Sequence, residues 1–173
     1  MLSTSSIQNA FRLLPLTALL TGCLSVQIEG QVAGHDMGFI ESSFAVQEPI
    51  VSMDPEADAG DYQLLMSDSR IACGDAELLG QPNGKNHTLA ISLRKADGSA
   101  PTEGFYQVGA KKDEDEAAGT FIFTTGVTAS LVYARAGEVQ LDLSSGDSVE
   151  GWFWLEFDQG KLEGIISSAP CIP

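Results

Sequence analysis

Histidine, cysteine and basic residues are scarce in this chain. Its 173 residues include two histidines, three cysteines and nine lysines and arginines, against 24 acidic residues, so the net charge is −15. Such a charge repels nucleic-acid phosphates and anionic lipid headgroups, and it favours basic partners, cationic ligands or divalent ions. We therefore expect no nucleic-acid partner. Solubility at high local concentration would explain the same charge without any ligand.

The common catalytic motifs are missing. The sequence contains no Gly-x-Ser-x-Gly elbow, no His-Glu-x-x-His, no Cys-x-x-Cys and no phosphate-binding glycine loop. The two histidines, His35 and His87, each stand alone. A triad of distant serine, histidine and aspartate residues would carry no such motif, because triads are defined by geometry. We predict that the protein is not an enzyme, with a secreted hydrolase as an alternative.

Long apolar runs are absent as well. The run from Leu13 to Leu20 is less than half of the about 20 residues that a membrane-spanning helix needs. Residues 1–22 contain no acidic side chain and a single basic one, Arg12, which is the pattern of an export signal. A cut after Ser25, with Cys23 and Ser25 as the small residues of the cleavage site, would release a soluble secreted protein.

The run ends in Leu-Thr-Gly-Cys at residues 20–23, which resembles the lipobox of bacterial lipoproteins. In that family the segment before the cysteine is removed, and the cysteine carries a diacylglyceryl group and usually a further acyl chain, such as palmitate. The resemblance implies that Cys23 is lipidated, and two or three acyl chains hold a protein stably on a membrane. Leu24 is not the aspartate that retains such proteins at the inner membrane, so the resemblance implies the outer membrane. It leaves the periplasmic and surface-facing sides open.

Lipidation of Cys23 would leave Cys73 and Cys171 as the remaining pair. Export would place both cysteines in an oxidising compartment, where disulfides persist. A Cys73–Cys171 bridge would close a loop of about 100 residues. In the chain-entropy model, closing a loop of that length contributes about 4–5 kcal/mol of stability. The alternative is that both thiols are free.

The rest of the chain, residues 23–173, has the length of one domain and reads as short strands. Val26, Ile28, Gly30 and Val32 alternate with polar residues, as in a half-buried strand. A turn at 34–38 and a strand at 40–46 would complete a hairpin with it. Further strands are expected at 62–66, 87–94 and 105–108, and the charged run 111–116 is expected to be a solvated loop.

After Gly119 the pattern is that of an antiparallel meander. Strand-like segments are found at 120–125, 127–135, 138–143, 148–157 and 161–168. Short turn sequences separate them, among them Ala136-Gly137. With hardly any helical periodicity, this predicts an all-β fold, either an antiparallel sandwich or a partly closed barrel.

The order of these features resembles a group of small bacterial lipoproteins. The residues concerned are the sequence Ser-Arg-Ile-Ala-Cys at 69–73, the strand Thr-Leu-Ala-Ile-Ser-Leu at 88–93, Val-Glu-Gly at 149–151, Leu-Glu-Gly at 162–164 and the near-terminal Cys171. The resemblance implies a disulfide-closed β domain and no known activity.

An acidic segment offers a candidate metal site. Asp54, Glu56, Asp58 and Asp61 could gather oxygen atoms around Ca²⁺. They do not match an EF-hand loop, because Ala59 stands where that loop needs glycine and Leu65 where it needs the bidentate glutamate. A solvated acidic loop is the favoured interpretation, so no cofactor is expected and Ca²⁺ remains the alternative.

Two tryptophans offer a candidate binding site. Trp152 and Trp154 share one face of an expected strand with Glu150 and Glu156. The opposite face carries Val149, Phe153, Leu155 and Phe157. Exposed indoles beside carboxylates could stack on a sugar or hold a cationic ligand, whereas covered indoles would belong to the core. Taken together, the sequence predicts a lipid-anchored envelope protein with a binding or structural role. The sequence does not identify its partner, which could be a protein or a glycan.

Overall fold

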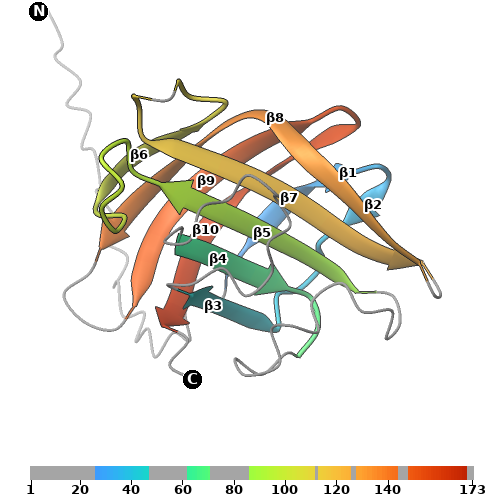
Figure 1. The fold of residues 1–173 in the computed structure, drawn as a ribbon. Coiled ribbons are helices and arrows are strands. Elements are labelled where there is room, and N and C mark those ends of the chain that lie inside the picture. Colours follow the sequence, from blue (N-terminus) through green and yellow to red (C-terminus); the bar gives the residue numbers. More distant parts are fainter. Residues whose placement is uncertain are drawn as a thin grey trace, which may run out of the picture.

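The computed structural model describes residues 26–46, 62–70, 86–111, 113–125, 128–143 and 148–170. In these ranges the secondary structure is entirely β, which confirms the predicted fold class (Figure 1). The strands are β1 (Ile28–Val32), β2 (His35–Asp36), β3 (Ser42–Val46), β4 (Tyr62–Ser67), β5 (His87–Arg94), β6 (Gly104–Val108), β7 (Glu116–Thr125), β8 (Thr128–Leu143), β9 (Val149–Phe157) and β10 (Gly160–Pro170). Within these ranges there is no helix long and apolar enough to cross a membrane.

The strands form a ring. The order β3, β4, β5, β7, β8, β9, β10 runs through antiparallel pairs, and β10 returns to β3 through two parallel residue pairs, Ala169 with Phe44 and Pro170 with Ala45. A 2.6 Å hydrogen bond between the hydroxyls of Ser43 and Ser168 supports this short closure. The first half of β10 pairs instead with β1. The barrel is therefore closed at one end of β10 and extended by the β1–β2 hairpin at the other.

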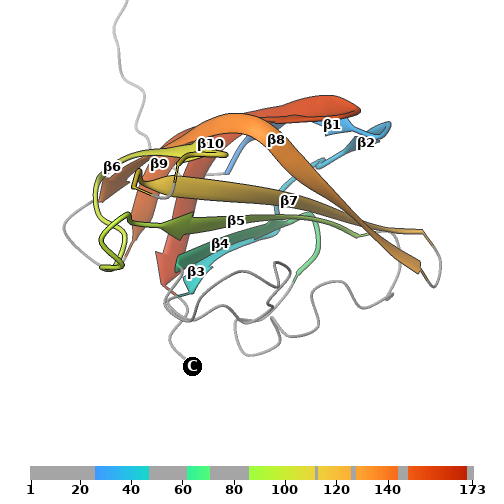
Figure 2. The same cartoon turned by 45° about the horizontal axis from the view of Figure 1, so that its top comes forward.

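The core lies between the two walls of the barrel. Figure 2 shows β8, β9 and β10 curving over β7, β5 and β4. Inward-facing side chains fill the space between them, and the largest include Tyr106, Phe121, Phe153 and Phe157. Burying each such side chain stabilises the fold by about 1.5–3 kcal/mol. The alternation expected for β9 is confirmed, because Val149, Phe153, Leu155 and Phe157 are all buried.

One predicted turn is wrong. Ala136 and Gly137 do not join two strands, since β8 runs without interruption from Thr128 to Leu143. The pairing with β9 shifts by one residue between Ala134 and Ala136, which makes this a β-bulge. Gly137 has φ +155°, and a Cβ there would lie 2.4 Å from the carbonyl oxygen of Trp154. The glycine thus permits a bend within one strand, whose first half pairs with β7 and whose second half pairs with β6.

The expected opening hairpin is also wrong. β1 turns back through Ala33 and Gly34, both with positive φ, and pairs with β2. A two-residue turn of this kind matches the twist of its strands. β3, which was expected to be the second strand of the hairpin, pairs with β4 and β10.

Several predictions concern residues outside the described ranges. They are the export segment 1–22, the lipidated Cys23, the pair Cys73 and Cys171, and the carboxylates Asp54, Glu56, Asp58 and Asp61. These stay predictions from the sequence.

Candidate functional site

Both tryptophans lie on the outer wall of the barrel. Trp152 is 36% exposed and Trp154 is 42% exposed, on the side of β9 opposite its buried residues. The alternative that they are covered core residues therefore does not hold. We call the surface around them the aromatic–acidic face and define it by Phe105, Glu138, Gln140, Trp152, Trp154, Glu163 and Ile165, together with Gln27 and Glu29.

Trp154 stands between two carboxylate-bearing residues. Its direct register partners are Glu138 on β8 and Glu163 on β10. Glu29 on β1 is in turn opposite Glu163. Residues directly opposite one another on neighbouring strands share a face, with their Cβ atoms about 4.5–5.5 Å apart. The register therefore places one indole within a row of three glutamates.

Trp152 is held in place by its neighbours. Its indole Nε1 donates a 2.7 Å hydrogen bond to Oε1 of Gln140, its partner on β8. Phe105 on β6 lies edge-on to the indole, with ring centroids 6.5 Å apart and planes at 72°. On the other side, Trp152 is opposite Ile165, which is itself 54% exposed. These contacts place an apolar surface beside the acidic row.

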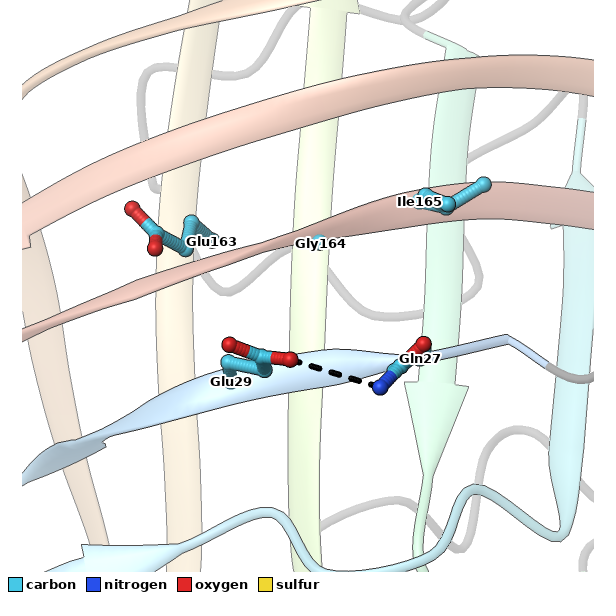
Figure 3. Close-up of a pocket in the computed structure, with 5 residues that line it drawn as sticks. All are labelled: Gln27, Glu29, Glu163, Gly164 and Ile165. Carbon is cyan, nitrogen blue, oxygen red and sulfur yellow. Dashed lines mark hydrogen bonds between the residues drawn. The ribbon is translucent and has the colours of Figure 1, made fainter. Parts of the chain in front are cut away.

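A shallow pocket of about 130 Å³ continues this surface onto β1. Figure 3 shows its lining: the carboxylates of Glu29 and Glu163 lie at one end, and Gln27 and Ile165 at the other. Gly164 lies between Glu163 and Ile165, and a Cβ there would lie 2.5 Å from the carbonyl oxygen of Gln27, so the glycine allows β1 and β10 to approach closely beneath the pocket.

The two pocket glutamates carry like charges in directly opposed positions, an arrangement that destabilises a sheet. Lys161 Nζ lies 3.3 Å from Glu163 Oε2, and Gln27 Nε2 lies 3.3 Å from Glu29 Oε1. These bonds relieve part of the repulsion. A ligand cation between the two carboxylates would relieve more of it.

The two glutamates singled out from the sequence play different parts. Glu156 forms an ion pair with Arg135, so its charge is partly neutralised. Glu150 is opposite Asp142 and Ser167, two residue pairs beyond Trp152. The carboxylates nearest Trp154 are instead Glu138 and Glu163. Sequence reasoning missed them because they come from other strands, whose register the sequence does not state.

A second polar cluster joins residues that stand apart in the sequence. The Nδ1 of His35 on β2 and the Nε2 of His87 on β5 are 3.2 Å apart. The other ring nitrogen of His87, Nδ1, is 2.6 Å from Oδ2 of Asp68. This resembles the acid and base of a hydrolytic triad, but Nε2 of His87 faces a second imidazole where a triad needs a nucleophilic hydroxyl. The arrangement does not favour the hydrolase alternative.

No family model, curated protein or solved structure significantly matches this chain.

Proposed function

We propose that this protein is a lipid-anchored envelope protein whose barrel binds a cationic partner on its aromatic–acidic face. The observation that carries the binding role is the position of Trp154 between Glu138 and Glu163, with Glu29 beyond. An indole face attracts a cation that lies within about 6 Å of the ring centroid. Adjacent carboxylates add charge-assisted hydrogen bonds to the same cation. The partner class is a protein segment rich in arginine or lysine.

The charge of the whole chain supports the same class of partner. A net charge of −15 steers basic partners toward the protein and disfavours anionic ones. On the face itself, Lys161 already pairs with Glu163, which shows that an ammonium group can reach this carboxylate. An incoming arginine can instead place its planar guanidinium on the indole and bond a carboxylate at its edge.

Binding is tested on the purified protein by tryptophan fluorescence and calorimetry. The probes are an arginine-rich peptide, the same peptide with citrulline at each arginine, and neutral cell-wall oligosaccharides. We expect saturable binding of the arginine peptide alone, weakening as salt is raised. Binding of the oligosaccharides and not the peptide would replace the proposal with a glycan-binding one. Binding of none would favour a structural role.

Variants locate the binding on the face. Trp154→Ala and Glu163→Gln should each weaken peptide binding at least fivefold, because each removes one of the two attractions. Phe39→Ala is the matched control, since Phe39 is an exposed aromatic residue between β2 and β3. An equal loss in the control would contradict the assignment to this face.

The envelope location rests on the Leu-Thr-Gly-Cys sequence and is tested separately. Cys23→Ala should abolish acylation, detected by labelling with an alkyne fatty acid, and should release the protein from the outer-membrane fraction. Protease access on intact cells distinguishes the surface from the periplasmic side. We also propose that Cys73 and Cys171 form a disulfide. Thiol labelling without reductant tests it, because the wild type should then show neither thiol reactive and Cys73→Ser should show one.

A further inference from the structure

The histidine cluster beside the β1–β2 hairpin has the geometry of a metal site. Two imidazole nitrogens bound to one tetrahedral Zn²⁺, at about 2.0–2.1 Å each, lie about 3.3–3.4 Å apart. The Nδ1 of His35 and the Nε2 of His87 are 3.2 Å apart. We propose that these two nitrogens bind a divalent transition ion of the class that prefers imidazole, represented by Zn²⁺ and Cu²⁺.

Asp68 prepares His87 to act as a ligand. Its Oδ2 accepts a hydrogen bond from Nδ1 of His87 at 2.6 Å, and its Oδ1 accepts the backbone N–H of His87 at 2.8 Å. The proton of His87 is thus held on Nδ1, which leaves the lone pair of Nε2 directed at His35. A metal-bound histidine characteristically donates its other N–H to a carboxylate, which fixes its tautomer and increases its basicity.

Aromatic rings hold both imidazoles in position. His35 stacks on Phe123 with centroids 4.1 Å apart, and His87 lies parallel to Phe121 at 5.9 Å. Without metal, the Nδ1–H of His35 donates a hydrogen bond to Nε2 of His87. Binding requires that this proton move to Nε2 of His35, so that both lone pairs face the ion. Imidazole has both neutral tautomers available.

The site is open on one side. His87 and Asp68 have 18% and 17% of their side-chain surface exposed, so water can complete the coordination. In the described part of the chain no group of three or more His, Cys, Asp or Glu side chains is arranged around a common ion position. The proposed site therefore has two protein ligands, and we expect binding weaker than that of a closed structural zinc site. The ion would link β2 to β5. This link lies at the end of the barrel where β10 pairs with β1, and the closure of β10 onto β3 lies at the other end.

The experiment uses the untagged protein, because His35 and His87 are the two histidines of the 173-residue sequence. Zn²⁺ and Cu²⁺ are the probes. We expect one ion per chain by calorimetry, an increased melting temperature with Zn²⁺, and a Cu²⁺ electron paramagnetic resonance spectrum with hyperfine coupling to two nitrogens. The ¹⁵N signals of both imidazoles should shift with Zn²⁺, a measurement that needs no substitution.

Substitutions then separate the ligands from the supporting carboxylate. His35→Gln should lower affinity at least tenfold and leave coupling to one nitrogen, and His87→Gln should do the same. Asp68→Asn should weaken binding about 10–100-fold and keep both nitrogens. Glu103→Gln is the control and should leave affinity unchanged, because Glu103 is an exposed carboxylate just before β6 and belongs to neither proposed site. Imidazole signals that do not move with Zn²⁺, or equal affinity in wild type and His35→Gln, would overturn the proposal.

Discussion

Trp152 and Gln140 are joined across β8 and β9 by a 2.7 Å hydrogen bond from the indole Nε1 to the amide oxygen. The bond lies on the exposed outer wall, where water competes for both groups, so its value for stability is small. Its main effect is to fix the orientation of the ring. An indole held in one rotamer loses less conformational entropy when a ligand stacks on it.

Gln140→Leu tests this role. The change removes the acceptor and keeps a side chain of similar size, so we expect the free energy of unfolding to change by at most about 0.5–1.5 kcal/mol. Affinity for the arginine peptide should fall a few-fold, because Trp152 becomes free to rotate. Fluorescence anisotropy of the indole and a peptide titration measure the two effects. Unchanged affinity with a more mobile ring would contradict the orienting role.

Neighbouring residues on β9 should differ sharply in their effect on stability. Phe153 is 1% exposed, and Phe153→Ala should cost about 3–5 kcal/mol by leaving a cavity in the core. Trp154→Ala removes a side chain that is 42% exposed and should cost clearly less. Urea denaturation of the two variants measures both values. Equal destabilisation would mean that Trp154 serves the fold more than a ligand.

Much of the fold could be predicted from the sequence, because strand periodicity is a local property. The alternation of Val149, Phe153, Leu155 and Phe157 gave the buried side of β9 directly. The bend in β8 was misassigned because Ala-Gly is equally suitable for a turn and for a bulge. Only the partner strand decides between them, since Gly137 lies against the carbonyl of Trp154.

The candidate sites were less predictable, because they depend on which strands are neighbours. Trp152 and Trp154 could be found by their spacing on one strand. Glu138 and Glu163 become significant only through the registers of β8 and β10 with β9. No spacing rule would have paired His35 with His87, which lie 52 residues apart and meet because the β1–β2 hairpin folds toward β5.

Gly137→Ala should destabilise the barrel strongly. The new methyl group would lie 2.4 Å from the Trp154 carbonyl oxygen, at a residue with φ +155°. We expect a loss of about 2–5 kcal/mol from backbone strain and overpacking together. Gly98→Ala is the matched control, since Gly98 also has positive φ (+71°) but no atom within 4 Å of an added Cβ. The control should lose about 1–2 kcal/mol. Similar melting temperatures for the two variants would contradict the close contact.

The stability of the barrel should depend on Tyr62 at alkaline pH. Burial raises the pKa of the Tyr62 hydroxyl above its usual value of 10.0, because the phenolate is poorly solvated where the ring packs against the core. The folded state therefore holds this proton more tightly than the unfolded chain. Its contribution to stability is complete below about pH 10 and is lost as the pH rises through the folded-state pKa.

Tyr62→Phe removes this ionisation while keeping the ring. Between about pH 9 and 11 we expect the variant to lose less stability than the wild type, measured as the shift in urea midpoint. Tyr133→Phe is the control, because Tyr133 is 56% exposed and has no comparable burial. A wild type and a Tyr62→Phe variant that lose stability in parallel would show that Tyr62 ionises equally easily in the folded and unfolded chain.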